Sequence, residues 1–260
     1  LHFKKKFGVP FIFDMRGFWA DERVDGKIWD LNNPVHNRIY RFFKKREPVF
    51  FEEAAAVVSL THTGKKEIVE KFISDPQFGG GSLFYNFDRA SAVRDKTAVI
   101  PCAADMELFD PAAVDENRKR WFAAKYGLET DRAYLGYLGS LGTWYMGREM
   151  MELYAVLRRH QPDLRFLVLS QDDAEEWLEY ARQLRIPQSC VVHISAERKD
   201  LPTLMSFMSA AVFFILPVFS KKASSPTKQG ELMAMGIPVI CNAGVGDTKD
   251  IVEKYEGGYV

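Results

Sequence analysis

Residues 133–260 alternate between short apolar runs and longer amphipathic runs, and this alternation constrains the fold more than any other feature of the sequence. A run of about four to eight apolar residues bounded by turn residues is typical of a buried strand. Strands that alternate with amphipathic helices predict βαβ units and a parallel sheet. Strands are expected at 133–139, 165–170, 190–194, 211–217 and 238–241, and helices at 147–159, 173–184, 201–209, 226–235 and 248–254.

The first hundred residues show the same alternation less regularly. The segment 105–111 is polar, ends in proline and has the character of a connection between domains. We therefore predict two α/β domains, residues 1–105 and 106–260. In the first, strands are expected at 9–14, 55–60 and 97–101, helices at 34–51 and 63–72, a loop at 15–33, and an irregular loop at Gly79, Gly80 and Gly81.

The overall charge and the cysteines exclude several classes of protein. The chain has 35 Lys+Arg and 35 Asp+Glu, so no global field favours nucleic acid. Cys102, Cys190 and Cys241 are too far apart to suggest a disulfide framework or a metal site. We read them as reduced and mostly buried, which favours the cytoplasm. Neither a signal peptide nor a membrane-spanning run is recognisable.

Parallel sheets bind ligands outside the carboxyl ends of their strands, next to helix N-termini. This rule directs attention to residues 139–147, 170–173, 194–200 and 217–227. In the last of these, Ser225 is a suitable N-cap and Pro226 suits the first helical position. The helix entry would then offer backbone N–H groups and a positive dipole end to a phosphate.

Thr227, Lys228 and Glu231 are spaced so that they share one face of this helix. A lysine at a phosphate-binding helix start, followed one turn later by a carboxylate, fits a nucleotide: the cation binds the pyrophosphate and the carboxylate binds the ribose hydroxyls. The alternative is a capped helix with an exposed Lys228–Glu231 ion pair of little energetic value. Spacing alone leaves both interpretations open.

Residues 211–251, above all SSPTKQGELMAMGIPVICNAGVGDTKDI, resemble the family-4 glycosyltransferases of the GT-B fold. The likeness extends to LGSLGTWY, VIPCAADMELF and FDMRGFW, and so to nearly the whole chain. It implies two Rossmann-like domains whose parallel sheets face a cleft, with residues 106–260 binding the donor. It also implies that Glu231 holds the donor ribose.

Three departures from the family pattern stand out. The family's first glutamate, eight positions before Glu231, falls on Ala223, and residues 138–147 contain no Lys or Arg. Lys228 is expected to take over the pyrophosphate. Both ends look short, so we expect the first domain to lack its early strands and the second its closing helices.

The resemblance and the strand ends suggest further site residues. Arg16 lies where relatives carry a cleft histidine, and we assign it, with Lys228, to catalysis; a salt bridge to Asp14 or Glu22 is the alternative. The remaining donor-binding candidates are Gly139, Ser140, Gly142, Thr143, Ser195, Glu197, Arg198, Ser224, Ser225, Thr227 and Glu231. Residues 171–173 are better explained as a helix N-cap than as a metal-binding acid pair. The five histidines show no metal-ligand spacing.

Residues 1–50 have 11 Lys/Arg against six Asp/Glu, a local excess of about five positive charges. Within them, RIYRFFKKR (38–46) combines cations with aromatic side chains. Such a segment can contact anionic lipid that carries an acceptor, although a solvated helix face is the more common explanation.

From the residues and the resemblance together we expect a glycosyltransferase. It would move a sugar from an NDP-sugar, with UDP favoured, to a hydroxyl of a glycan or lipid-linked acceptor in polysaccharide synthesis. Retention of configuration is implied by the resemblance alone, and no metal or other cofactor is expected. A cytoplasmic location, peripheral to the inner membrane, fits these expectations. The alternatives are a nucleotide-sugar epimerase of the same fold and a non-catalytic nucleotide-sugar-binding module.

Overall fold

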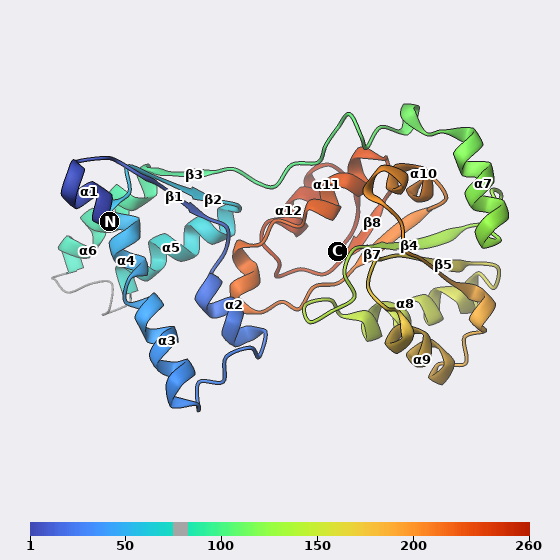
Figure 1. Ribbon diagram of the computed structural model, residues 1–260, viewed down its shortest axis with the longest axis horizontal. Coiled ribbons are helices and arrows are strands. Elements are labelled where there is room, and N and C mark those ends of the chain that lie inside the picture. Colours follow the sequence, from blue (N-terminus) through green and yellow to red (C-terminus); the bar gives the residue numbers. More distant parts are fainter. Residues whose placement is uncertain (75–82) are drawn as a thin grey trace. The chain divides into compact units, whose positions relative to one another are not determined.

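Two parallel sheets organise the chain in a computed structural model that describes the backbone of residues 1–74 and 83–260 (Figure 1). The loop expected at Gly79, Gly80 and Gly81 lies outside the described residues. Two units can be distinguished. Unit 1 comprises residues 1–102, 217–225 and 244–247, and unit 2 comprises residues 103–216, 226–243 and 248–260. The predicted boundary at 105/106 lies close to the first of these breaks, whereas the two later segments of unit 1 were not expected.

The sheet of unit 1 has three parallel strands in the order β1-β2-β3. They are β1 (Ile12–Met15), β2 (Ala56–Ser59) and β3 (Thr97–Val99). The last two lie within the predicted runs, whereas β1 starts three residues later than the run predicted at 9–14 and ends one residue beyond it. The core is apolar and aromatic, and it includes Met15, Phe18, Phe51, Val57, Ile68 and Ala223. The helices are α1 (His2–Phe7), α2 (Trp19–Asp25), α3 (Pro34–Lys44), α4 (Glu47–Glu53), α5 (His62–Ser74) and α6 (Leu83–Asp95).

Two predictions for unit 1 are wrong. The loop expected at 15–33 contains the helix α2, and the single helix expected at 34–51 is split into α3 and α4. Pro48 explains the split, because it has no N–H to donate to the carbonyl of Lys44 and its ring would crowd that carbonyl. Helix α4 therefore starts afresh at Glu47, with Pro48 in its first turn.

The later segments complete unit 1 through specific contacts. The side chain of Asp247 accepts hydrogen bonds from the backbone N–H groups of His62 (2.6 Å) and Thr63 (2.9 Å), so it caps the start of α5. Lys221, in a 3₁₀ turn at Phe219–Ala223, forms a salt bridge of 2.6 Å with Glu22. Unit 1 thus depends on residues that lie far apart in the sequence.

The sheet of unit 2 has six parallel strands in the order β6-β5-β4-β7-β8-β9. The chain runs outward from β4 to β6 and then returns to the other side of β4 as β7. The sheet therefore has a topological switch point between β4 and β7, the place where such sheets bind ligands. The strands are β4 (Tyr134–Leu138), β5 (Arg165–Leu169), β6 (Val191–Ile194), β7 (Ala210–Phe213), β8 (Val239–Cys241) and β9 (Gly258–Tyr259).

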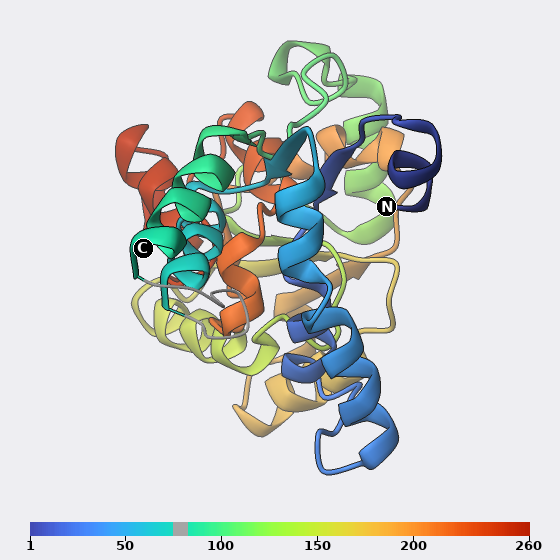
Figure 2. The same cartoon turned by 90° about the vertical axis from the view of Figure 1, so that its left-hand side faces the viewer.

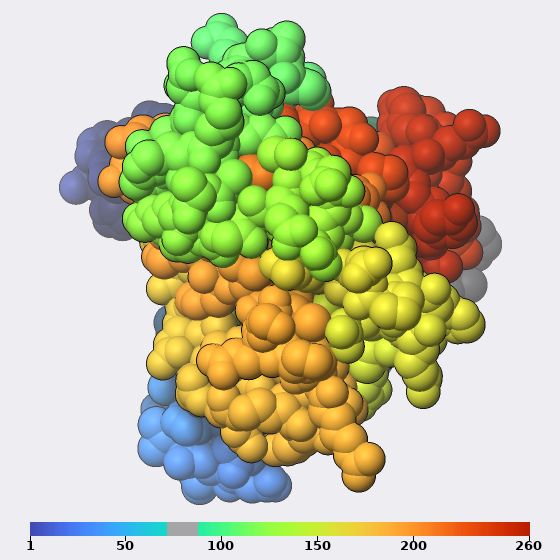
Figure 3. Space-filling model, turned by 90° about the vertical axis from the view of Figure 1, so that its right-hand side faces the viewer, coloured from blue at the N-terminus to red at the C-terminus, as the bar shows by residue number. Residues whose placement is uncertain are grey.

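The helices of unit 2 follow its strands as the alternation predicted, except for α7, which precedes β4 and was not predicted. They are α7 (Glu116–Tyr126), α8 (Gly147–His160), α9 (Glu175–Gln183), α10 (Leu201–Met205), α11 (Thr227–Ala234) and α12 (Thr248–Lys254). Figure 3 shows one face of this unit, with α7 in green. Large side chains that are fully buried between helices and sheet include Tyr134, Tyr154, Phe166, Met150 and Met151.

The cysteines are only partly as expected. All three are free, but Cys102 is exposed and Cys190 half-buried, and only Cys241 is buried. Burial raises the pKa of the Cys241 thiol to about 11. Among the described residues, no helix combines the length and the apolar character that crossing a bilayer requires.

Candidate functional site

Gly139 follows β4 directly at the switch point of unit 2. Its φ of +122° is a conformation that side chains with a Cβ rarely adopt, and a Cβ built there would lie 2.6 Å from Nζ of Lys228. The glycine therefore lets the backbone after β4 approach the ammonium group closely. This contact joins two predicted site residues, one from the end of β4 and one from α11.

Lys228 lies in α11 and is 8% exposed. Its Nζ donates a hydrogen bond of 3.2 Å to the hydroxyl of Tyr137 and lies 3.8 Å from the ring centroid of Tyr145 and 4.5 Å from that of Tyr137. Two aromatic rings thus hold the ammonium, in place of a carboxylate. The Tyr137 hydroxyl in turn donates to the carbonyl of Ser140.

Burial lowers the pKa of Lys228 from 10.5 to about 7, and Glu231 opposes this shift only in part. Removal from water disfavours the charged form of an amine unless an anion compensates for it. A buried lysine whose nearest groups are phenol rings is suited to bind a ligand that brings its own negative charge. Burial also raises the pKa of both tyrosines, so their hydroxyls stay neutral.

Glu231, one turn along α11, is 5% exposed and forms a salt bridge with Arg198 (2.9 Å between Oε1 and Nη1). The Arg198 side chain is 57% exposed, and its guanidinium lies 5.1 Å from the ring centroid of Phe109. The alternative of an exposed Lys228–Glu231 ion pair is therefore wrong: both side chains are buried, and the carboxylate pairs with Arg198. The shared face is confirmed for Lys228 and Glu231, whereas Thr227 is exposed.

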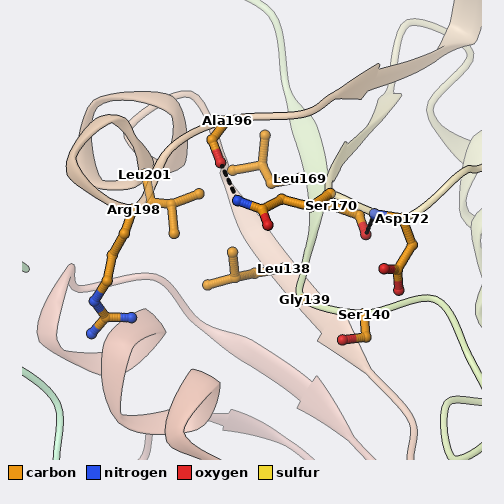
Figure 4. Close-up of a pocket in the computed structure, with 10 residues that line it drawn as sticks. Leu138, Gly139, Ser140, Leu169, Ser170, Asp172, Ala196, Arg198 and Leu201 are labelled. Atoms are coloured by element: carbon orange, nitrogen blue, oxygen red, sulfur yellow. Dashed lines mark hydrogen bonds between the residues drawn. The ribbon is translucent and has the colours of Figure 1, made fainter.

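A cavity of about 260 Å³ lies beside these residues, at the ends of β4, β5 and β6 (Figure 4). Three leucines form its apolar floor, with Arg198 on one side and Ser140 and Asp172 on the other. Several polar groups around the rim form hydrogen bonds with one another. The lining residues are Leu138, Gly139, Ser140, Leu169, Ser170, Gln171, Asp172, Ala196, Arg198 and Leu201.

Hydrogen bonds order the rim of this cavity. The backbone N–H of Leu141 donates to Asp172 (2.8 Å), and the Gln171 amide donates to the carbonyl of Ala196 (3.4 Å). Asp173 accepts a hydrogen bond from the backbone N–H of Glu175 (2.9 Å), but the N-cap of α9 is Ala174, and no side chain caps this helix. The N-cap predicted at 171–173 is therefore wrong, and Gln171 and Asp172 line the cavity.

The start of α11 differs from the prediction. Pro226 is the N-cap, no side chain caps the helix, and Thr227 is its first residue. The hydroxyl of Ser225 instead accepts the backbone N–H of Cys102 (3.1 Å) within unit 1. Within the part of the chain that the structure describes, no side chain accepts a hydrogen bond from the first N–H groups of α11, which lie close to Lys228.

The other predicted residues fall into two groups. Within unit 2, Gly142 and Thr143 lie exposed in the loop after β4, Ser195 is exposed after β6, and Glu197 pairs with Lys199 (2.6 Å). Within unit 1, Arg16 is 88% exposed at the end of β1 and lies 3.7 Å from Asp14, which is the salt bridge named as its alternative; Ser224 and Ser225 also belong to this unit.

Ala223, at the position of the missing glutamate, is fully buried in the apolar core of unit 1. Sequence reasoning missed Tyr137 and Tyr145, the partners of Lys228, and Asp172 at the cavity. The signal that could have found Tyr137 is its place in a strand whose carboxyl end was already a candidate site. Among residues 1–74 and 83–260, no three His, Cys, Asp or Glu side chains are arranged to hold a metal ion.

The family profile described as Glycosyl transferases group 1 matches residues 119–260, more than half of the chain and nearly all of unit 2. The chain belongs to this family. No curated protein sequence matches the chain.

Solved structures agree with this assignment at the level of the fold. The chain is similar to WaaG, a glycosyltransferase involved in lipopolysaccharide biosynthesis (TM-score 0.64, 16% identity, 100% of this chain and 66% of that one). It is also similar to a glycosyltransferase from Rickettsia africae (TM-score 0.62, 14% identity), with 99% of this chain and 57% of that one covered. A third similar structure is TarM of S. aureus in complex with UDP (TM-score 0.53, 11% identity), with 84% of this chain and 36% of that one covered.

These likenesses confirm the predicted fold class, an α/β fold of GT-B type with parallel sheets. The chain spans 66% or less of the length of each of these three proteins. Unit 2, with its six-stranded sheet, contains the cavity, Lys228 and Glu231.

Proposed function

We propose that the chain is the donor-binding part of a glycosyltransferase that transfers a sugar from an NDP-sugar, with UDP favoured, to a hydroxyl of a glycan or lipid-linked acceptor. The observation that carries the proposal is Lys228, a buried ammonium at the switch point of the unit 2 sheet that forms no salt bridge with a carboxylate of the described residues. A bound diphosphate would supply the negative charge that compensates the charge of this buried ammonium.

Three parts of the donor would contact three different sets of residues. Its diphosphate meets Lys228 and the uncapped N–H groups of α11, where the helix dipole is positive. The ribose hydroxyls meet the carboxylate of Glu231, held in position by Arg198. The base enters the cavity of about 260 Å³, whose apolar floor suits a planar ring and whose rim offers polar groups.

Transfer breaks the bond between the sugar and the diphosphate, so negative charge grows on the leaving oxygen. Lys228 and the α11 N–H groups are fixed before the reaction and oppose that charge as it forms. The acceptor hydroxyl attacks the sugar carbon and passes its proton to the departing diphosphate oxygen, so that the new glycosidic bond replaces the broken one and the charges balance. This scheme needs no metal ion, and retention of configuration is proposed from the family resemblance alone. Arg16 is proposed as a further contact to donor or acceptor.

We place the reaction in polysaccharide synthesis at the cytoplasmic face of the inner membrane, with peripheral contact to the lipid. TarM, one of the similar structures, was crystallised with UDP, and WaaG acts in lipopolysaccharide biosynthesis. Both facts support a UDP-sugar and an envelope glycan as the first substrates to test.

The decisive experiment is a calorimetric titration of the chain with UDP, GDP and ADP, with Glu231→Ala and Glu176→Ala beside it. Glu176 is an exposed glutamate in α9, so its removal controls for the loss of one charge. Binding of one nucleotide that only Glu231→Ala weakens, by about tenfold or more, supports the donor site. If the folded chain binds none of the three, the donor assignment is wrong for this chain. Product analysis with the matching NDP-sugar and acceptor then separates transfer from epimerisation and from binding alone.

A further inference from the structure

Helix α3 is attached to unit 1 in an unusual way. It starts after Asn33, whose side chain accepts the backbone N–H groups of Val35 and His36, and none of its 11 residues is buried. An amphipathic helix of a globular protein normally turns its apolar stripe toward the core. In Figure 2, which faces unit 1, α3 is the medium-blue helix at the lower right, below the lighter-blue α4. Its sequence was already singled out by its mixture of cations and aromatic residues.

The inner side of α3 is polar. Tyr40 donates to Asp21 of α2 (2.9 Å), and Lys44 donates to the other oxygen of the same carboxylate (2.8 Å). Lys44 also pairs with Glu47. Burial alone would lower the pKa of Lys44, but these two carboxylates raise it, so the ammonium stays charged. Hydrogen bonds and ion pairs, rather than apolar packing, hold this side of the helix.

The outer side is apolar. Val35, Ile39 and Phe42 recur at the spacing of one helical face and are 64%, 37% and 49% exposed. We call these three residues the outer stripe. Beside it, Phe43 packs edge to face on Trp19, which is itself 45% exposed (4.9 Å between ring centroids). The helix is thus inverted, with its apolar face toward the solvent.

Cations flank the outer stripe. Arg38, Arg41, Lys45 and Arg46, here called the basic flank, are all exposed, and α3 contains neither Asp nor Glu. The Arg46 guanidinium lies 3.4 Å from the ring centroid of Phe42, so it covers part of the stripe while keeping its charge. The charges that border the stripe along the helix are therefore all positive.

We propose that the outer stripe and basic flank of α3 dock on the surface of a bilayer that contains anionic lipid. The helix would lie in the plane of the interface, with Val35, Ile39 and Phe42 at the acyl boundary and the cations among the lipid phosphates. Trp19 sits where aromatic rings favour the interface. A second copy of the chain fits less well, because a symmetric contact through this face would bring basic flanks together.

This inference locates the membrane contact proposed above, but its test is independent of the donor site, because it needs neither nucleotide nor acceptor. The chain is sedimented with vesicles of phosphatidylcholine alone and with vesicles containing about 30% phosphatidylglycerol. We expect binding to the anionic vesicles only, and loss of that binding at high salt, because exposed charges are screened. Arg38→Glu/Arg41→Glu should weaken it by at least about 25-fold, since each lost cation contributes roughly a factor of five and the two new carboxylates are repelled by the anionic surface.

A second variant, Ile39→Ser/Phe42→Ser, tests the stripe and should weaken vesicle binding by about tenfold. The matched controls lie in α7 of unit 2. Trp121→Ser removes an aromatic side chain that is also 45% exposed beside cations, and Arg120→Glu/Lys125→Glu makes the same change in charge. Both controls should bind vesicles within about twofold of the unchanged chain.

The proposal is overturned if the unchanged chain does not bind anionic vesicles, if it binds neutral ones equally, or if the α7 controls lose as much as the α3 variants. Sedimentation velocity adds a further check: a dimer that only the α3 variants dissociate, together with absence of lipid binding, would make the occupant a second copy. Thermal unfolding confirms that each variant is folded. Should the stripe variant unfold, the charge-reversal pair alone decides.

Discussion

At the scale of single residues, the proton on Lys228 offers the sharpest test of the donor site. Its pKa of about 7 in the free protein lies below the ordinary value because of burial. A bound diphosphate favours the charged form and so raises this pKa. Above pH 7, binding must first add a proton, and UDP affinity should fall by up to tenfold per pH unit until the pKa of the complex is reached.

Calorimetry in buffers of different ionisation enthalpy, between about pH 7.5 and 9.5, measures both the affinity and the proton taken up with UDP. Lys228→Met should remove the pH dependence together with most of the affinity. Lys249→Met, an exposed lysine in α12, should change neither. An affinity that stays flat over this range in the unchanged chain would contradict the assignment of the diphosphate to Lys228.

Lys228 should also lower the free energy of unfolding of the chain. Between pH 7 and its ordinary pKa of 10.5, Lys228 binds fewer protons in the folded than in the unfolded chain, so its contribution to the free energy of unfolding rises with pH. At or below pH 7 the full cost of burying the amine is present. Lys228→Met should therefore raise the free energy of unfolding at pH 7 by roughly 1–3 kcal/mol. Denaturant titrations at pH 7 and pH 9 check both the sign and the shrinking difference.

A substitution at Gly139 tests the close approach of the backbone to the Lys228 ammonium. Gly139→Ala puts a Cβ 2.6 Å from the Lys228 ammonium at a φ of +122°, so we expect a loss of about 1–3 kcal/mol in stability and a displaced ammonium that binds UDP about tenfold more weakly. Gly142→Ala, three residues along the same loop, meets nothing within 4 Å and is the matched control. Equal behaviour of the two variants would show that close approach at Gly139 is not needed.

At the scale of elements, sequence reasoning succeeded where one local pattern decides the structure. The central strands β4 and β5 of unit 2 are buried on both sides almost throughout and therefore read as continuous apolar runs, such as Tyr134–Leu138. Helix α7 was missed although Asp115 caps it and Gly127 ends it in the left-handed conformation, both readable signals. The sequence between these two residues is mostly polar, so its apolar residues did not reveal a helical period.

The candidate site was predicted in the same uneven way. The spacing of Lys228 and Glu231 within one helix is a local property, and it was found. The pairing of Glu231 with Arg198 and the enclosure of Lys228 by Tyr137 and Tyr145 join different elements of unit 2. Such contacts depend on the order of the strands in the sheet, which the sequence of a single chain does not specify.

Ala223 shows how an element can exclude a residue that the family usually carries. Its side chain is fully buried among the apolar residues of unit 1. A Cβ built on Gly64 would lie only 3.0 Å from the Cβ of Ala223, so there is little room for a larger side chain. Ala223→Glu should therefore lower the free energy of unfolding by about 3 kcal/mol or more, because a carboxylate would be buried without a partner. Thermal unfolding beside Ala124→Glu, an exposed position in α7, checks this. Better UDP binding with unchanged stability would count against it.

At the scale of the whole molecule, unit 1 is completed by residues that follow most of unit 2 in the sequence. The backbone N–H groups at the start of α5 are capped by Asp247, and Thr61 donates to the carbonyl of Lys222 (2.8 Å). Ala223 and Phe219 belong to its core or pack against it. A cut between residues 105 and 106, where the sequence alone would place a domain boundary, removes all of these contacts at once.

We therefore expect residues 1–105, expressed alone, to lack cooperative unfolding, whereas the whole chain should show it. The lost apolar contacts and helix caps each amount to about 1–3 kcal/mol, and together they approach the full stability of a small domain. Circular dichroism and amide hydrogen exchange compare the two, and Asp247→Ala in the whole chain isolates the cap. That variant should weaken protection at the start of α5 while leaving β4 and β5 unchanged. If residues 1–105 fold cooperatively by themselves, unit 1 does not need its later segments, and the break between the units is simply the one near residue 105.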